Sequence, residues 1–205
     1  MPLAGNATLF TVSDVLAEGL HDRLRDIELI AASPEAQRFA SEPLPLTATL
    51  ERLRRARPSL AWIGVVDANG AGTRTVTGTV TNATGDLLVG QNVSERPWFK
   101  AALNGPHVGD VHLAKLLAKF VPAGADGGPP RFVDFAAPVR AADGSVVAVI
   151  GAHGRWDWAG EVVARLKSPR ALDQDVQVFI VDRSGVPLYR PLRAGAVVPE
   201  LKVVG

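Results

Sequence analysis

Residues 132–153 read FVDFAAPVRAADGSVVAVIGAH, which is the clearest hairpin signal in the chain. Two apolar runs, residues 132–140 and 145–153, are rich in valine and each is long enough for a β-strand. Between them lies Ala142-Asp143-Gly144, and Asp-Gly between apolar runs is a strong hairpin signal. We therefore expect two antiparallel strands joined by a tight turn.

Further β-type segments lie on both sides of this hairpin. Residues 61–67 predict a buried strand, and residues 73–81, rich in threonine and valine, follow a tight-turn signal at Asn69-Gly70. Residues 108–117 predict one more strand, although residues 113–120 also fit a helix. Residues 176–189 predict a second hairpin.

Helical patterns precede and separate the strands. From residue 7 to residue 32, apolar residues recur in steps of three and four, which predicts one stripe of a long helix. Residues 47–56 predict another helix, and Ser94 can cap a short helix over residues 95–103. The stripe of the long helix comprises Val12, Val15, Leu16, Leu20, Leu24, Ile27 and Ala31.

This order of elements predicts an α+β fold. We expect a PAS-like, five-stranded, mostly antiparallel sheet with helices on one face. A helix over residues 156–166 separates this sheet from the second hairpin. We expect the chain to divide into three regions: a stalk helix with short helices (residues 1–57), the PAS-like module (residues 58–170) and a curtailed second module (residues 171–205).

The composition excludes several classes of protein. The 205 residues include 22 Lys and Arg against 21 Asp and Glu, which argues against a nucleic-acid partner. The absence of cysteine excludes disulfides, thiol catalysis and thiolate metal sites. We find no apolar run of the ~20 residues that cross a bilayer and no signal peptide. The expectation is a cytosolic protein or, preferably, a soluble piece of a longer one.

Enzyme motifs are missing from the sequence. It contains no phosphate-binding P-loop, GxGxxG, HExxH or GxSxG pattern. We therefore expect a protein that is not an enzyme and that uses no cofactor and no metal. A metal held by Asp110, His112 and His153 across neighbouring strands is the alternative that remains open.

Polar residues interrupt the apolar strands. Asp110 and His112 alternate on one predicted strand, Asp134 lies inside the next, and His153 ends the last. A buried polar side chain costs several kcal/mol, roughly 2 to 7, unless it is paired. Each of these can be paired internally, but four of them together favour a pocket.

The segment Arg96-Pro97-Trp98-Phe99 begins the predicted short helix. Arg96 carries a planar fork of donors that suits a carboxylate, and the Trp98 indole adds an N–H donor. With the free N–H groups of a helix start, these residues predict an anion site. Alternatively, Arg96 pairs with a nearby aspartate, and Trp98 and Phe99 belong to the core.

These segments resemble the Cache family, and more closely the double-Cache extracytoplasmic sensor domains of bacterial receptors. The resemblance covers roughly residues 7–189. It implies the periplasmic part of an inner-membrane protein that binds a small molecule, dimerises through its N-terminal helix and controls a histidine kinase, a diguanylate cyclase or phosphodiesterase, or a chemoreceptor. The segments that carry it are residues 61–67, 93–99, 106–112, 132–140 and 146–153.

The resemblance also implies roles for individual residues. The amino-acid-binding branch of the family holds the ligand carboxylate with Arg and Trp at the positions of Arg96 and Trp98. It holds the ammonium group with Tyr-x-Asp and a final aspartate, where this chain has His112, Ala114 and His153. The implied ligand is a carboxylate or another anion-bearing metabolite.

Two alternatives stay open. Asp134 or Asp110 can restore ammonium recognition, which would make the chain an amino-acid or amine sensor. In the second alternative the chain is a dimerisation domain that binds no ligand, and apolar side chains fill its pocket. The residues predicted to bind the ligand are Arg96, Trp98, Phe99 (where a tyrosine is usual in the family), Asp110, His112, Asp134 and His153.

Overall fold

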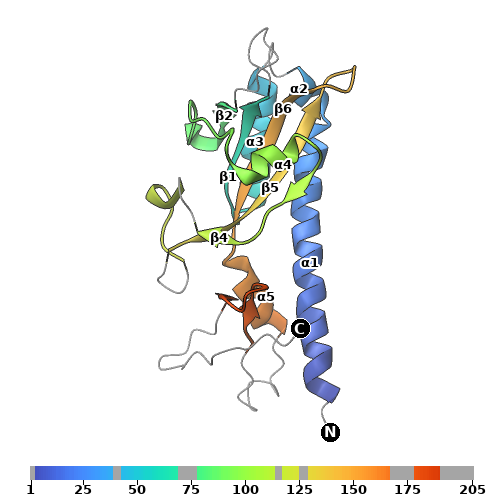
Figure 1. The fold of residues 1–205 in the computed structure, drawn as a ribbon, viewed down its shortest axis with the longest axis vertical. Helices are drawn as coiled ribbons and strands as arrows, with labels where there is room; N and C mark the ends of the chain where they lie inside the picture. Colours follow the sequence, from blue (N-terminus) through green and yellow to red (C-terminus); the bar gives the residue numbers. More distant parts are fainter. Residues whose placement is uncertain are drawn as a thin grey trace.

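An antiparallel sheet forms the centre of the molecule (Figure 1). The computed structural model describes residues 3–38, 43–68, 78–113, 117–124, 129–166 and 178–189. The strands of the sheet are β1 (Leu60–Asp67), β2 (Val80–Ala83), β3 (His107–Val108), β4 (His112–Leu113), β5 (Arg131–Arg140) and β6 (Val146–Arg155). Their order is β2-β1-β6-β5-β3, and β4 also pairs with β5.

The hairpin predicted from residues 132–153 is confirmed as β5 and β6. Its register places Asp134 directly opposite His153, and β1 places Trp62 on the other side of His153. A second row, of small residues, runs parallel to this one: Gly64 and Ala136 lie on either side of Gly151. The sheet therefore presents two neighbouring rows. One carries polar and aromatic side chains, and the other carries no side chain larger than a methyl group.

The β5–β6 turn depends on Asp143. Its Oδ1 accepts hydrogen bonds from the Ser145 hydroxyl (2.6 Å) and the Ser145 backbone N–H (2.9 Å). These bonds lower the pKa of the Asp143 carboxyl below its ordinary value of 3.8. A carboxyl whose pKa is lower in the folded state stabilises the protein above its unfolded pKa, and this contribution is lost as the pH falls through the folded pKa.

We therefore expect Asp143→Ala to lower the melting temperature at pH 7 more than at about pH 2, because the contribution of the charged carboxyl declines as the pH falls below the pKa of the unfolded chain. Thermal unfolding of both chains at the two pH values measures this. An equal loss at both would show that the charge of Asp143 does not contribute.

Helices cover both faces of the sheet. Contacts on one face come from α1 (Leu3–Ala31), α2 (Pro34–Gln37), α3 (Pro43–Ala56) and α5 (Trp158–Leu166), and those on the other from α4 (Pro97–Ala102). Along β1, Ile63 and Val65 face the first group, whereas Trp62 and Val66 face α4. The expectation of helices on one face is therefore wrong for α4. The central strands are apolar on both sides, and both sides need cover.

The long N-terminal helix is confirmed as α1, which runs most of the length of the molecule (Figure 1). It begins earlier than predicted and ends at Ala31. The Oγ of Ser33 caps α2 by accepting a hydrogen bond from the N–H of Ala36 (3.2 Å). The predicted helix 47–56 begins at Pro43 instead, because proline is tolerated in the first turn of a helix. Within the described ranges, none of the helices combines the length and the hydropathy that a bilayer span requires.

The helix predicted over residues 95–103 is shorter than expected. It is α4, six residues long, and its N-cap is Arg96 rather than Ser94. The N–H and hydroxyl of Ser94 instead bond to Oδ1 of Asn92 (3.0 and 2.7 Å). Pro97 fixes the start of the helix, because its missing N–H is no loss at the first helical position.

The strand predicted over residues 108–117 is in fact two short strands, β3 and β4, so the sheet has six strands rather than five. Gly109, Asp110 and Val111 separate them, and the N–H of Gly109 bonds to the backbone oxygen of Asp134 (2.8 Å). This bond holds the segment between β3 and β4 against β5, next to Asp134.

The second predicted hairpin is confirmed as β7 (Ile180–Val181) and β8 (Pro187–Tyr189). The indole N–H of Trp156 donates to the backbone oxygen of Leu188 (3.0 Å), which ties β8 to the turn before α5. The turn at Asn69-Gly70 and residues 73–77 lie outside the described residues. The division into three regions stays a prediction.

Candidate ligand pocket

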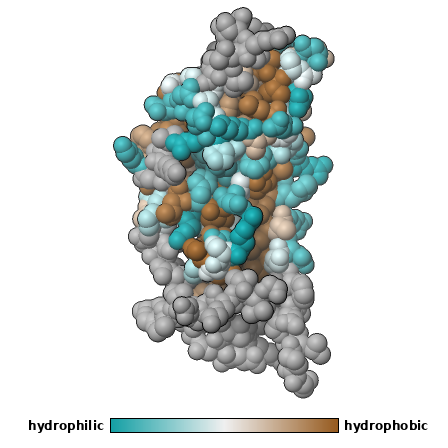
Figure 2. Space-filling view, in the orientation of Figure 1, coloured by the Kyte–Doolittle hydropathy of each residue, from teal (hydrophilic) through white to brown (hydrophobic). Residues whose placement is uncertain are grey.

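A cavity of about 500 Å³ opens between α4 and the sheet. This volume lies within the range of small-molecule sites, about 300 to 1,000 Å³. Figure 2 shows the same side as Figure 1, with apolar residues exposed between hydrophilic ones. The residues that line the cavity are Trp62, Leu88, Val93, Arg96, Pro97, Trp98, His107, Val108, Gly109, Asp110, His112, Leu117, Phe132, Asp134 and His153.

Six of the seven residues predicted to bind a ligand line this cavity, and Phe99 is the exception. The Phe99 side chain is fully buried in the core, with its ring edge-on to Trp98 (centroids 6.0 Å apart). Successive residues on a helix point about 100° apart. Trp98 therefore reaches the cavity while its neighbour turns into the core, so the structure does not bring Phe99 to the site.

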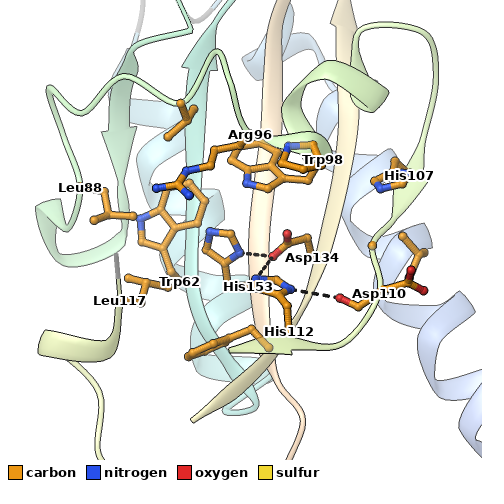
Figure 3. A pocket seen from close by; sticks show the side chains of 15 residues that line it. Trp62, Leu88, Arg96, Trp98, His107, Asp110, His112, Leu117, Asp134 and His153 are labelled. Carbon is orange, nitrogen blue, oxygen red and sulfur yellow. Dashed lines mark hydrogen bonds and ion pairs between the residues drawn. The ribbon is translucent and has the colours of Figure 1, made fainter. Parts of the chain in front are cut away.

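Arg96 and Trp98 contribute hydrogen-bond donors to the cavity. In Figure 3 both lie above the imidazole rings of His153 and His112. The guanidinium of Arg96 makes no hydrogen bond or ion pair with any residue that the structure describes. The alternative in which Arg96 pairs with an aspartate therefore finds no support in this part of the chain.

Asp134 is the most buried charged group of the cavity. Its Oδ1 accepts a hydrogen bond from Nδ1 of His153 (2.5 Å) and lies 3.6 Å from Nε2 of His112. The side chains of Asp134 and His153 are 10% and 12% exposed, against 41% for His112. The three residues come from β4, β5 and β6, and Figure 3 shows both imidazoles directed at the one carboxylate.

Aromatic rings fix the position of His153. Its imidazole stacks on Trp62, with centroids 4.9 Å apart and planes 27° apart, and meets Trp98 edge-on at 5.8 Å. The Trp62 indole N–H donates to the backbone oxygen of Leu87 (2.9 Å), which holds that ring in place. His153 is therefore held between two tryptophans and a carboxylate.

Asp110 lies at the open edge of the cavity. Its backbone oxygen pairs with Nδ1 of His112 (3.0 Å). Its carboxylate is 94% exposed and lies 3.9 Å from the guanidinium of Arg183, which is a weak pair because both groups are in water. Among the described residues, no group of three or more His, Asp or Glu side chains is arranged to hold a metal ion.

The sequence prediction missed Trp62, His107 and Phe132. Phe132 could have been found, because it lies two residues before Asp134 on one strand and side chains two apart share a face. Trp62 carries no such signal, since its place beside His153 depends on the pairing of β1 with β6. His107 joins the cavity only because the segment before β4 folds back along β5.

No protein-family model matches the chain, and no curated protein matches its sequence. Solved structures do resemble its fold. The extracellular ligand-binding receptor from Desulfohalobium retbaense superposes with a TM-score of 0.68 at 16% identity, over 93% of this chain and 31% of that one.

Two further structures are similar. The ligand-binding domain of the Campylobacter jejuni chemoreceptor Tlp3, in complex with 4-methylisoleucine, has a TM-score of 0.61 at 14% identity, covering 90% of this chain and 66% of that one. The sensor domain of the V. cholerae histidine kinase DctB has a TM-score of 0.53 at 16% identity, covering 78% and 57%.

These structures extend beyond the region that this chain matches, which is 31% of the Desulfohalobium receptor and 57% of the DctB domain. In this chain the long helix α1 packs on the antiparallel sheet β1–β6, which is consistent with an α+β PAS-like fold. The chain therefore has the fold of Cache-type sensor domains.

Proposed function

We propose that this chain is the extracytoplasmic sensor domain of a bacterial membrane receptor, and that its cavity binds a small carboxylate-bearing metabolite. The observation that carries the proposal is the guanidinium of Arg96, which lines a cavity of about 500 Å³ without a partner among the described residues. A guanidinium beside an indole N–H suits a planar carboxylate. The fold supports a binding function rather than catalysis, because the similar structures are sensor and receptor domains.

Occupancy of the cavity would be reported through a shift between two arrangements of the domain. A ligand favours the arrangement that it binds more tightly, by as much as its affinities for the two differ. β6 carries His153 at the cavity and leads directly to Trp156 and α5, which packs against α1. The output would be a histidine kinase, a diguanylate cyclase or phosphodiesterase, or a chemoreceptor, on the other side of the inner membrane.

An amino-acid or amine sensor is the second candidate. It is favoured by the carboxylates of Asp110 and Asp134 in the cavity wall and by the similarity to amino-acid chemoreceptors, such as the Pseudomonas aeruginosa ligand-binding domain in complex with GABA. A domain without a ligand is less well supported, because the space around Arg96 is not filled by apolar side chains.

A thermal-shift screen of the purified chain tests the proposal. A ligand that binds only the folded state raises the melting temperature by mass action. The panel contains organic acids, amino acids, amines and purines, each repeated with Arg96→Ala. Shifts by carboxylates that vanish in the variant support the proposal. Shifts by amines alone, or shifts that Arg96→Ala leaves unchanged, contradict the carboxylate site.

We also propose a homodimer through α1. Most residues of the α1 stripe are buried or partly buried against the core, whereas Leu29 remains 64% exposed on this helix. If α1 joins two copies, Leu29→Glu is expected to shift the chain towards monomer in analytical ultracentrifugation. A wild-type chain that sediments as a monomer throughout the micromolar range would contradict a dimer of the isolated domain.

A further inference from the structure

Residues 117–124, between β4 and β5, cover one side of the cavity. Leu117 is 3% exposed and lines the cavity together with Trp62 (Figure 3). Val121 packs against the same apolar cluster, whereas Phe120 is 56% exposed. The segment therefore places one apolar side chain in the cavity wall while other parts of it lie in solvent.

Arg155 ties this segment to the sheet. It lies opposite Phe132, a residue of the cavity wall, in the pairing of β5 with β6. Its guanidinium donates hydrogen bonds to the backbone oxygens of Pro122 (3.5 Å) and Ala123 (3.1 Å). Within the described residues, no other hydrogen bond joins residues 117–124 to the rest of the protein. Segments with few buried contacts and exposed hydrogen bonds open most readily.

Asp157 fixes the orientation of Arg155. Its Oδ2 accepts hydrogen bonds from Nε of Arg155 (2.9 Å) and from Nη2 of the same guanidinium. The two side chains are 21% and 30% exposed, so water screens the pair only in part. Asp157 immediately precedes α5. The carboxylate that holds Arg155 in place therefore belongs to the start of that helix.

The next residue extends these contacts to α1. Trp158 is the first residue of α5, and the guanidinium of Arg23 lies over its indole, 4.2 Å from the ring centroid. A Cβ on Gly19 would lie 3.0 Å from Cζ3 of this ring. The indole therefore fits against α1 with no spare room, and a displacement of the start of α5 changes its contacts with α1.

This contact between α1 and α5 leaves two donors unsatisfied. The indole N–H of Trp158 and Nε of Arg23 are buried without a hydrogen-bond partner among the residues that the structure describes. An unpaired buried donor is a cost to the folded state. The cost favours a second arrangement in which α5 is displaced and water reaches these groups.

We propose that residues 117–124 form a lid of the cavity, that Arg155 is the positioning residue that holds the lid closed, and that Asp157 couples the lid to α5. Opening of the lid removes the carbonyl acceptors of Arg155 and loosens the start of α5. Displacement of Trp158 in turn releases the lid, because a coupling between two sites is reciprocal. The inference goes beyond the proposed function. Its test uses no ligand, so either can fail while the other stands.

Hydrogen–deuterium exchange of the 205-residue chain, followed by mass spectrometry, measures the closure of the lid. We expect Arg155→Met to speed the exchange of residues 117–124 by about 2- to 12-fold, which is the effect of one lost hydrogen bond. Exchange in β5 and β6 should stay as in the wild-type chain. Arg140→Met is the matched control, since it removes the same charge and a hydrogen bond to the backbone oxygen of Gly144 (2.9 Å) elsewhere.

A substitution on α1 tests the coupling from the other end. Gly19→Val presses on Trp158 and is expected to speed the exchange of residues 117–124. It should add nothing to the effect of Arg155→Met, because the connection through Arg155 is already lost. Ala17→Val, which adds the same side chain at an exposed position of α1, should leave the lid unchanged. Arg155→Met should also speed the exchange of residues 158–166.

Three results would overturn the inference. Wild-type exchange of residues 117–124 in Arg155→Met would show that Arg155 does not hold the lid. Equal acceleration in Arg140→Met would show that loss of charge alone is responsible. Unchanged exchange of residues 158–166 in Arg155→Met, or additive effects of Gly19→Val and Arg155→Met, would disprove the coupling. The first of these two measurements decides the coupling if Gly19→Val does not fold.

Discussion

Replacing Arg96 with alanine is expected to weaken binding of a carboxylate ligand by about 10- to 150-fold. A hydrogen bond to a charged group contributes about 1.5 to 3 kcal/mol, which corresponds to this range. The change should have little effect on folding, because the Arg96 side chain bonds to no described residue and its position as the N-cap of α4 involves no side-chain cap. Calorimetry with a carboxylate identified by the thermal-shift screen measures the loss.

Lys100→Ala is the matched control for this experiment. Lys100 lies on the same helix and is also a cation, but its Nζ is directed at the exposed carboxylate of Glu95 (2.7 Å) and it does not line the cavity. Removing it changes the net charge by the same amount. Affinity that falls equally in both variants would mean that general electrostatic attraction, rather than a contact with Arg96, holds the ligand.

Gly151→Val is expected to abolish measurable ligand binding and to destabilise the fold by about 1 to 3 kcal/mol, as overpacking of a core does. A Cβ on Gly151 would lie 2.6 Å from Cζ3 and 2.8 Å from Cη2 of Trp98, closer than real contacts allow. The indole is rigid, so it must move as a unit, and its movement disturbs both the cavity wall and the edge contact with His153.

Gly105→Ala serves as the control for the glycine substitution. A Cβ on Gly105 meets nothing within 4 Å, and the residue lies just beyond α4. Chemical unfolding and calorimetry of both variants test the prediction. A folded Gly151→Val chain that binds its ligand with wild-type affinity would show that the position of Trp98 does not matter for recognition.

The row of small residues in the sheet explains why both ligand binding and stability are expected to depend on Gly151. Gly64 and Ala136 lie on either side of Gly151 in the pairing of β1, β6 and β5. The large side chains Trp62 and Trp98 occupy the space above these residues. Period-two patterns reveal the face on which each residue lies, but the row itself depends on the registers of both strand pairs.

Much of the fold could be predicted because it depends on neighbours along the chain. The 132–153 hairpin, the stripe of α1 and the second hairpin were all visible as local periodicity and turn chemistry. Predictions failed where a long-range contact decided the outcome. The Gly109 bond to β5 accompanies the division of the expected strand into β3 and β4, and the apolar second face of the sheet accounts for α4.

Several chemical groups of the cavity could be identified from residue order alone. Arg96 and Trp98 lie in one short segment of the sequence, and Asp134 and His153 interrupt apolar runs. Both observations can be made from the order of the residues alone. The pairing of these groups depends on how the strands come together. Asp134 and His153 are 19 residues apart, and they meet because the register of β5 with β6 places them opposite one another. Register is a property of two strands and their packing, so no single segment could show that the carboxylate is bound by an imidazole.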